Sequence, residues 1–326
     1  MKSLITGGAG FIGCHLAENL VRLNHKVIIL DNFRTGKKKN IKKIKHKIKI
    51  IKCDISKNGN WKKYFKDVDW VFHFAGLVDI VPSIENPKNY FNVNVNGTLN
   101  VLQACRKIKL KKFIYAASAS CYGIPKKYPT PETSKINPQY PYALTKWLGE
   151  ELVMHWHRVY KLKAISLRFF NLYGTRSRTT GTYGAMFGTF LAQKLAGLPF
   201  TVVGNGNQKR DFTYIGDAVE AIISAAKSDF SGEVFNVGSG KSVSVNRIIK
   251  LLDGEKIFIS KRPGEPDNTF ADIRKIKKYL NWLPKVNIEK GIEILKKNID
   301  DWKDAPIWTK DNIRIATKMW FKYLKK

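Results

Sequence analysis

The stretch Thr6–Gly13, which reads Thr-Gly-Gly-Ala-Gly-Phe-Ile-Gly, constrains the fold more than any other part of this chain. It comes directly after an apolar run typical of a strand, Lys2–Thr6, and it precedes an amphipathic helical pattern over Phe11–Leu23. Glycines at this spacing permit a tight turn, a close approach of the backbone to a pyrophosphate, and close packing of the helix on the strand. The N-terminus of the helix would offer N–H groups and the positive end of its dipole to phosphates. We therefore predict that a dinucleotide is bound here, by Gly7, Gly10, Phe11, Ile12 and Gly13.

A second strand, Lys26–Leu30, ends in an acid, Asp31, which lies 18 residues after Gly13. A carboxylate at this position can bind both hydroxyls of the adenosine ribose of NAD, and it would repel the additional phosphate of NADP. Arg34 and Lys37 lie close behind in the sequence and could favour NADP, so the residue types alone leave that alternative open. We predict NAD as the cofactor.

Strand and helix patterns alternate along the first half of the chain. The further strands are expected at Lys47–Ile51, Trp70–Phe74, Lys112–Tyr115 and Ala164–Phe169, and the further helices at Pro87–Lys109 and Tyr142–Tyr160. This alternation predicts an α/β fold with a Rossmann-type, doubly wound parallel sheet. Beyond Gly174 the alternation weakens, which indicates a smaller C-terminal α/β substrate domain. We predict an NAD-binding domain at 1–174, rejoined by about 211–238, and a second domain at 175–326.

The chain carries 58 Lys and Arg against 26 Asp and Glu, a formal net charge of +32. Such an excess is typical of proteins that bind nucleic acids. Here the lysines are spread along the chain, and the densest segment, 37–52, holds nine lysines but no aromatic residue that could stack on a base. We interpret the excess as a solvated surface and predict no nucleic-acid partner.

Two further absences in the sequence narrow the class of protein. The 326 residues contain no apolar run of about 18, so we expect no membrane partner and no spanning helix, and Met1 does not begin a pattern typical of a secretion signal. The four cysteines form no CxxC pair, which indicates a reducing, cytoplasmic location without disulfides or a metal site.

Tyr142 and Lys146 are four residues apart, which places them on one face of a helix. A phenol is a weak base at neutral pH unless a positive charge favours the phenolate, and the Lys146 ammonium together with a nicotinamide would supply one. Ser118, at the end of a strand 24 residues upstream, can bond the substrate hydroxyl from which Tyr142 takes a proton. These three residues predict catalysis of hydride removal from a secondary alcohol; Tyr140 is the competing tyrosine.

Taken in order, the motifs resemble the extended short-chain dehydrogenase/reductase family, and within it the nucleotide-sugar epimerases and dehydratases. The resemblance covers nearly the whole chain. It rests on Thr6–Gly13, Asp31-Asn32, Cys53-Asp54-Ile55, His73–Gly76, Asn94–Thr98, Ala117–Gly123, Tyr142–Lys146, Arg168–Gly174, Arg210–Asp217, Phe235–Gly240 and Arg262–Glu265.

The resemblance implies that 175–326 is a nucleotide-sugar-binding domain, and it implies roles for individual residues. Those assigned to NAD are Asp31, Asn32, Asp54 and Ile55 at its adenosine end, Ala75 and Gly76 along its path, Asn94 on a supporting helix, and Tyr142 and Lys146 at its nicotinamide end. Those assigned to a nucleotide-diphosphate sugar are Ser118 at the sugar, Asn171, Arg210 and Arg262 at the diphosphate, and Thr269 beside the sugar. Arginine suits binding of the diphosphate because its planar fork binds phosphate oxygens in pairs.

Members of this family differ in the fate of the sugar after its oxidation at C4. Dehydratases carry an Asp-Glu or Ser-Glu pair where this chain has Ala119 and Ser120, so the resemblance disfavours dehydration. Glu132, in the following loop, is an acid that could substitute. We predict an NAD-dependent nucleotide-sugar 4-epimerase, with a 4-dehydrogenase that releases a 4-keto sugar as the alternative. A non-catalytic NAD-binding protein is a third interpretation, kept because Ala116 and Ala117 stand where many relatives have serines.

The resemblance has two further implications. A tyrosine at the position of Thr269 would restrict the pocket to simple hexoses, so the small threonine predicts that bulky sugars, such as N-acetylhexosamines or heptoses, are admitted. Relatives are often dimers built on two long helices, here Pro87–Lys109 and Tyr142–Tyr160, so we expect a homodimer. The residues do not identify the nucleotide or the sugar.

Overall fold

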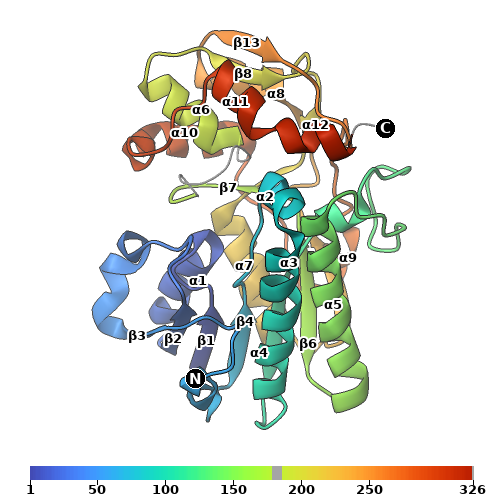
Figure 1. Cartoon of the computed structure of the whole chain (residues 1–326). Coiled ribbons are helices and arrows are strands. Elements are labelled where there is room, and N and C mark those ends of the chain that lie inside the picture. The colour runs from blue at the N-terminus through green and yellow to red at the C-terminus, as the bar shows by residue number, and fades with distance from the viewer. Residues whose placement is uncertain (178–185, 325–326) are drawn as a thin grey trace.

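In the computed structural model, which describes residues 1–177 and 186–324, seven parallel strands form the central sheet (Figure 1). Their spatial order is β3-β2-β1-β4-β5-β6-β11, so the order reverses between β1 and β4. The strands are β1 (Lys2–Thr6), β2 (Lys26–Asp31), β3 (Ile48–Lys52), β4 (Trp70–His73), β5 (Lys112–Ser118), β6 (Ala164–Phe169) and β11 (Glu233–Val237). This is the doubly wound sheet that the sequence predicts, and β11 lies beside β6 at one edge.

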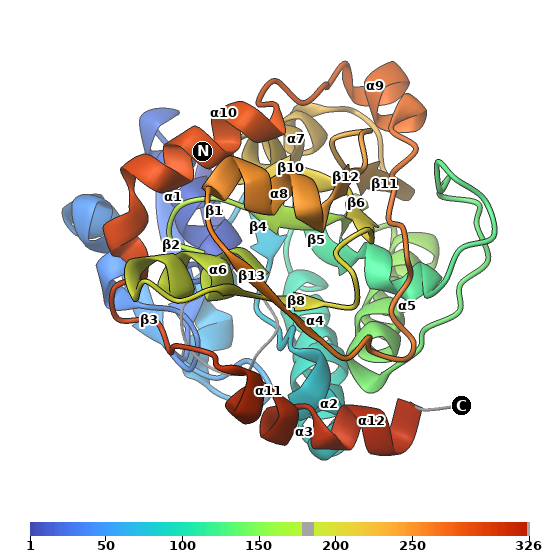
Figure 2. The same cartoon turned by 90° about the horizontal axis from the view of Figure 1, so that it is seen from above.

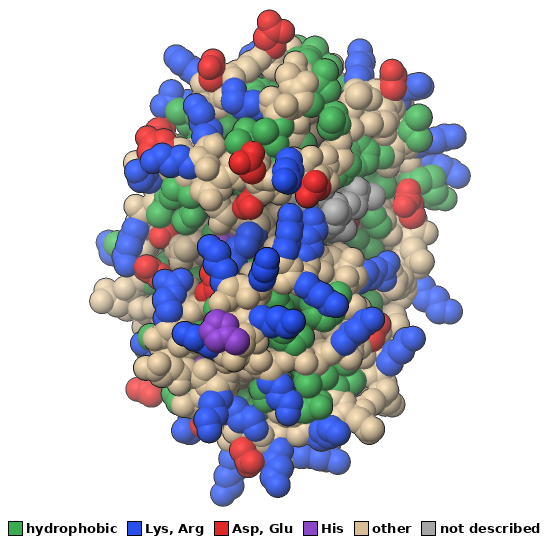
Figure 3. Space-filling model, turned by 90° about the vertical axis from the view of Figure 1, so that its left-hand side faces the viewer, with side chains coloured by type: hydrophobic (Ala, Val, Ile, Leu, Met, Phe, Trp, Pro, Cys, Tyr) green, Lys and Arg blue, Asp and Glu red, His purple; other side chains and the backbone are tan. Residues whose placement is uncertain are grey.

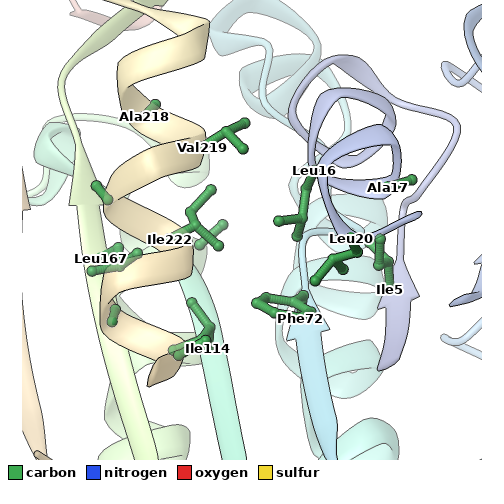
Figure 4. Close-up of a cluster of buried hydrophobic side chains, with 14 of the residues drawn as sticks. Ile5, Leu16, Ala17, Leu20, Phe72, Ile114, Leu167, Ala218, Val219 and Ile222 are labelled. Atoms are coloured by element: carbon green, nitrogen blue, oxygen red, sulfur yellow. The ribbon is translucent and has the colours of Figure 1, made fainter. Parts of the chain in front are cut away.

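Helices cover both faces of this sheet because successive residues of each strand point to opposite sides. In β1, Ile5 belongs to the core under α1 and α7, while Leu4 belongs to the core under α4 and α5. Figure 4 shows Leu16 and Leu20 of α1 and Val219 and Ile222 of α7 in the space between these two helices, near Phe72 of β4. The helices packed on the sheet are α1 (Phe11–Arg22), α4 (Gly97–Cys105), α5 (Pro141–Tyr160) and α7 (Ile215–Lys227).

The segments between these helices are shorter and less regular. The predicted helix Pro87–Lys109 is divided into α3 (Pro87–Phe91), a π-helical turn η3 (Asn92–Asn96) and α4, and it ends at Cys105. The lysine-rich segment forms a 3₁₀ helix, η1 (Lys38–Lys47), whose Ile41 and Ile44 are buried. The remaining short segments are α2 (Ile80–Glu85) and the 3₁₀ turns η2 (Asn60–Phe65) and η4 (Ala119–Tyr122).

The C-terminal region lies over the carboxyl ends of the strands (Figure 1). It contains three two-stranded sheets and its own core around the buried Trp302. The strand pairs are β7 (Asn171–Tyr173) with β10 (Phe212–Tyr214), β8 (Phe200–Val203) with β13 (Lys256–Ile259), and β9 (Lys209–Arg210) with β12 (Val243–Ser244). The helices are α6 (Met186–Leu195), α8 (Val245–Leu252), α9 (Arg274–Leu280), α10 (Ile288–Lys297), the 3₁₀ turn η5 (Ile299–Trp302), α11 (Lys310–Ala316) and α12 (Lys318–Leu324). Among the described residues, no helix has both the length and the apolar character needed to cross a bilayer.

Candidate active site

One cavity of about 660 Å³ lies between the carboxyl ends of the parallel strands and the C-terminal region. The strand order reverses there, which is where doubly wound sheets bind their ligands. Its volume is within the ordinary range for a small-molecule site. Every residue that the sequence assigns to the cofactor, the substrate or catalysis lines this cavity, with the exception of Asn94. Residues from both halves of the chain therefore form a single site.

The glycine turn has the geometry that a phosphate-binding turn requires. Gly7 has a φ of +72°, and a Cβ there would lie 2.7 Å from the backbone nitrogen of Ala75. A Cβ at Gly13 would collide with the carbonyl oxygen of Gly7. Gly10 caps α1 with extended backbone and without a side-chain hydrogen bond, and the first intrahelical bond of α1 is donated by the N–H of Cys14. The preceding N–H groups, those of Phe11, Ile12 and Gly13, have no intrahelical acceptor and suit a phosphate.

Asp31 is held at the end of β2 by two backbone donors. Its Oδ2 accepts from the N–H of Ala9 at 2.9 Å and its Oδ1 from that of Phe33 at 2.8 Å. Burial raises the pKa of this carboxyl above its ordinary value, and the two hydrogen bonds oppose that shift. The carboxylate thus fixes the glycine turn while it faces the cavity. Arg34 and Lys37, the residues that could favour NADP, line the same end of the cavity.

At the opposite end of the cofactor path, Ser118 and Tyr142 are in direct contact. The Tyr142 hydroxyl donates to Ser118 Oγ at 3.1 Å, and Ser120 Oγ donates to the same atom at 2.8 Å. Ser118 ends β5, whereas Tyr142 is in the first turn of α5, so the packing of α5 on β5 brings them together. Burial raises the pKa of Tyr142, and hydrogen bonding with Ser118 and Ser120 opposes that shift.

Lys146 lies one turn further along α5, and its ammonium is buried. Nζ is 4.4 Å from the centre of the Tyr115 ring, on whose face a cation is favourable. Burial lowers the pKa of Lys146 to about 7, although the Glu150 carboxylate, one further turn along α5, raises it. Lys146 therefore changes its charge near neutral pH instead of remaining fully charged.

Asn94 lies behind the cavity wall. Its Oδ1 accepts from Leu77 N–H at 2.8 Å, and its Nδ2 donates to the Leu77 carbonyl and to Thr145 Oγ1, both at 3.0 Å. The side chain thereby joins the loop after β4 to the helix that carries Tyr142 and Lys146.

A buried hydrogen-bonded chain supports the same loop. The Thr98 hydroxyl donates to the Asn94 carbonyl at 2.6 Å, so Thr98 Oγ1 accepts from His73 Nε2 at 2.9 Å. His73 Nδ1 then accepts from the Thr6 hydroxyl at 2.6 Å, and Thr6 Oγ1 accepts from Ala75 N–H at 3.2 Å. Burial lowers the pKa of His73 to about 3, so the ring is neutral, as this arrangement requires. The chain connects β1, β4 and α4 beneath the cofactor path.

Two arginines share one carboxylate at the predicted diphosphate end. Glu265 lies 3.1 Å from Arg262 and 3.6 Å from Arg210. Thr269 donates to Asn171 Oδ1 at 3.0 Å and accepts from the Asp211 N–H at 3.1 Å. Four of the five residues that the sequence assigns to the nucleotide sugar, all except Ser118, are thus gathered on one side of the cavity.

The cavity is also lined by residues that the sequence does not assign, among them Ser120, Tyr140, Glu265 and Trp320. Ser120 and Glu265 lie inside motifs that carry the resemblance, so the sequence contained a signal that could have placed them in the site. Trp320 lies far beyond the last of those motifs, and only the fold brings it to the cavity.

Two other features of the site bear on its chemistry. Glu132, the acid that could serve a dehydratase, accepts instead from the N–H of Asn236 at 2.9 Å and is not among the residues that line the cavity. In the described part of the chain, no group of three or more His, Cys, Asp or Glu side chains could hold a metal ion.

Comparisons with known proteins give the family. The model of the NAD dependent epimerase/dehydratase family matches residues 3–238. A putative UDP-glucose 4-epimerase of Methanocaldococcus jannaschii is 37% identical over 307 residues, which cover 92% of this chain and 97% of that protein. The structure of the UDP-N-acetylglucosamine 4-epimerase from Methanobrevibacter ruminantium M1, in complex with UDP-N-acetylmuramic acid, has a TM-score of 0.86 and 30% identity, covering 91% of this chain and 98% of that one. The UDP-glucuronic acid 4-epimerase from Bacillus cereus, in complex with UDP-glucuronic acid and NAD, has a TM-score of 0.86 and 33% identity, covering 92% and 99%. The chain is thus an enzyme of the NAD-dependent epimerase/dehydratase family, and NAD is its cofactor.

Proposed function

We propose that this enzyme is a 4-epimerase of UDP-sugars. The observation that carries the proposal is the contact of the Tyr142 hydroxyl with Ser118, in one cavity with Lys146, the glycine turn and two arginines. The three relatives compared with this chain are named as 4-epimerases, and each name or bound ligand contains UDP. In this proposal residues 1–174 and about 211–238 bind NAD, and the rest of 175–326 binds the nucleotide sugar.

The residues would act in a fixed order. Arg210 and Arg262 bind the diphosphate, and Asn171 donates its amide to it, so that C4 of the sugar lies at Ser118 and Tyr142. Tyr142 takes the proton of the 4-hydroxyl, and Ser118 holds the same oxygen by a hydrogen bond. NAD, which the glycine turn and Asp31 would hold, would supply the acceptor for the hydride from C4 and the donor that returns it. After the 4-keto sugar has rotated to present its other face, the hydride returns to C4 and Tyr142 gives its proton back to the oxygen. The product is the other epimer.

Retention of the keto sugar distinguishes an epimerase from a 4-dehydrogenase. The two arginines and Asn171 would hold the diphosphate throughout, which allows the sugar to rotate without leaving. Neither Ala119 nor Ser120 is an acid, and Glu132 is bound to the backbone of Asn236, so elimination of water has no acid group assigned to it. These features favour epimerisation over release or dehydration.

The size of the pocket beside the sugar depends on Thr269 in this proposal. Its hydroxyl is bonded to Asn171, and its small side chain leaves room for an N-acetyl group or a longer chain. We expect the Thr269→Tyr variant to lose activity on UDP-N-acetylglucosamine and to keep most of it on UDP-glucose. Equal loss on both substrates would contradict the proposed role.

We also propose that the enzyme is a homodimer through α3–α4 and α5. The two helical segments are packed together, and each carries an exposed large apolar side chain, Phe91 and Leu144. A dimer contact through these helices would bury the side chains of Phe91 and Leu144. Light scattering of the purified protein gives the mass directly; a monomer at micromolar concentration would contradict the proposal.

The experiment that tests the function is incubation with UDP-glucose, UDP-N-acetylglucosamine and UDP-glucuronate in turn. The sugar is monitored by NMR and the reduced cofactor by absorbance at 340 nm. A new C4 epimer without stoichiometric NADH supports the proposal, and Tyr142→Phe is expected to reduce the rate by about 10² or more. Accumulation of NADH with a keto product would identify the 4-dehydrogenase instead.

A further inference from the structure

The C-terminal helix α12 contributes one wall of the active-site cavity through a single buried side chain. Trp320 is 1% exposed and lines the cavity beside Tyr140 and Arg262. No motif that carries the resemblance extends beyond Glu265, and the family model ends at residue 238. The proposed reaction steps therefore assign no task to this tryptophan.

Trp320 is fixed against the loop that carries Arg262. The Arg262 guanidinium carbon lies 5.2 Å from the centre of the Trp320 ring, and the indole Nε1–H donates to the carbonyl of Pro263 at 2.7 Å. Glu265 accepts from the same guanidinium at 3.1 Å. The indole and the carboxylate thus restrict the rotamers of Arg262 before any ligand binds.

On its other side, Trp320 connects to the catalytic phenol. Its ring centre lies 6.3 Å from that of Tyr140, and the Tyr140 ring is stacked on Tyr142 at 6.2 Å with an angle of 8° between the planes. We call these three rings the aromatic wall. It extends from the residue assigned to proton transfer at C4 to an arginine assigned to the diphosphate.

Contacts on both sides of the cavity hold α12 and the segment that leads to it. Upstream, Trp302 is buried in the C-terminal core, and the Trp308 carbonyl accepts from Gln193. Downstream, α12 packs against α2, which begins directly after the cavity-lining residue Asp79. The segment from 303 to 324 therefore crosses from the C-terminal region to the NAD-binding side of the cavity (Figure 2).

We propose that Trp320 is a positioning residue for the nucleotide diphosphate: it holds Arg262 in the orientation that binds the phosphates. An arginine that is ordered in advance loses less side-chain entropy on binding, so the effect falls on affinity for the nucleotide. The inference rests on the proposed function for the identity of the ligand. It goes beyond that function in assigning the C-terminal helix to substrate binding.

The test compares Trp320→Ala and Trp320→Phe with a matched control on the same helix, Tyr323→Ala, whose side chain is exposed. Binding of UDP and of NAD is measured by calorimetry, and KM and kcat are measured with the active UDP-sugar. We expect Trp320→Ala to weaken UDP binding and raise KM by about tenfold, because the cation–π contact and the ordering of Arg262 are lost, with kcat and NAD affinity nearly unchanged. Trp320→Phe keeps a ring but not the bond to Pro263 and should lie between; Tyr323→Ala should match the wild type.

A double-mutant cycle shows whether Trp320 acts through Arg262. If it does, Trp320→Ala together with Arg262→Ala binds UDP no more weakly than Arg262→Ala alone. Additive losses, or an unchanged UDP affinity in Trp320→Ala, would overturn the inference. If Trp320→Ala does not fold, the same cycle is measured with Trp320→Phe.

The binding measurements also separate this inference from the proposed function. UDP binding requires no turnover. A wild type that binds UDP but epimerises no sugar therefore contradicts the proposed function. In that case the double-mutant cycle still decides whether Trp320 acts through Arg262. A wild type that epimerises, with KM unaffected in Trp320→Ala, contradicts the inference alone. A wild type that binds no UDP contradicts both.

Discussion

At the residue scale, the chemistry of the site depends on how deeply its ionisable groups are buried. The sequence predicts that Lys146 favours the phenolate of Tyr142. In the protein, burial is the largest influence on both groups: it raises the pKa of Tyr142 and lowers that of Lys146 to about 7. A base at Tyr142 near neutral pH therefore needs further positive charge, which the nicotinamide ring of NAD supplies when bound. The cofactor is thus part of the electrostatics of the base as well as the hydride acceptor.

The burial of Lys146 predicts a pH dependence of stability. Its pKa is about 7 in the folded protein and near the ordinary 10.5 when unfolded, so between these values the unfolded state binds the extra proton and stability rises with pH. Lys146→Met removes this contribution and leaves all other charges unchanged. Measured without nucleotide by denaturant unfolding, the stability of wild type relative to Lys146→Met should increase by about 2 kcal/mol from pH 7 to pH 9. A difference that is independent of pH would show that Lys146 keeps its ordinary pKa.

At the scale of elements, the sequence predicts regular structure well and interruptions poorly. The first six strands of the central sheet are predicted to within a few residues, because alternating strand and helix patterns and the glycine turn are local signals. The π-helical turn η3 within Pro87–Lys109 is not predicted, because no local pattern indicates it; Asn94 of this turn bonds to Leu77 and Thr145, which are 17 and 51 residues away in sequence. The apolar periodicity of that segment is compatible with one unbroken helix. Asn94 itself is found by the resemblance, but its partners are not.

Removal of the Asn94 side chain is expected to loosen this junction. Asn94→Ala leaves the buried N–H and carbonyl of Leu77 without their partner, which costs about 2–4 kcal/mol of stability. Because the Leu77 loop lines the cofactor path, the affinity for NAD should fall as well. Asn96→Ala, an exposed position on the same turn, is the matched control and should change stability by less than about 0.5 kcal/mol. Calorimetry and thermal unfolding measure both effects; equal results for the two variants would exclude the proposed role of Asn94.

At the scale of the whole molecule, the sequence predicts the sheet and the ligand-binding site, but it does not predict the wall of the cavity that the last helices form. The site residues of the NAD-binding half occur in motifs at strand ends, so they can be predicted. Trp320 is brought to Arg262 by the path of the last helices, and no local pattern indicates that path. The net charge of +32, the most extreme feature of the composition, is distributed over the surface, and Figure 3 shows Lys and Arg outnumbering Asp and Glu across one face. Only Lys146, Arg210 and Arg262 have assigned roles at the ligands.

The surface charge is expected to influence encounter rates. NAD and UDP-sugars are anions, so a basic protein attracts them at low ionic strength, and salt screens that attraction. Replacing the exposed Lys42, Lys43 and Lys45 of η1 by Gln should reduce the salt dependence of kcat/KM and leave kcat unchanged. The control replaces Lys107, Lys109 and Lys163, which are exposed. These lysines precede the amino ends of β5 and β6, whereas the cavity lies at the carboxyl ends of the strands. Identical salt profiles for both triple variants and the wild type would show that the lysines of η1 do not attract the substrate.

In the proposed reaction, C4 of a UDP-sugar is oxidised and reduced again without the sugar leaving. The most direct measurement uses the active UDP-sugar labelled with deuterium at C4 and traces the label by NMR and mass spectrometry. Because the hydride removed from C4 is the one returned to it, we predict that the epimeric product keeps its deuterium at C4 and that no net NADH forms. A product that lacks the deuterium, or a released 4-keto sugar with stoichiometric labelled NADH, would contradict this claim.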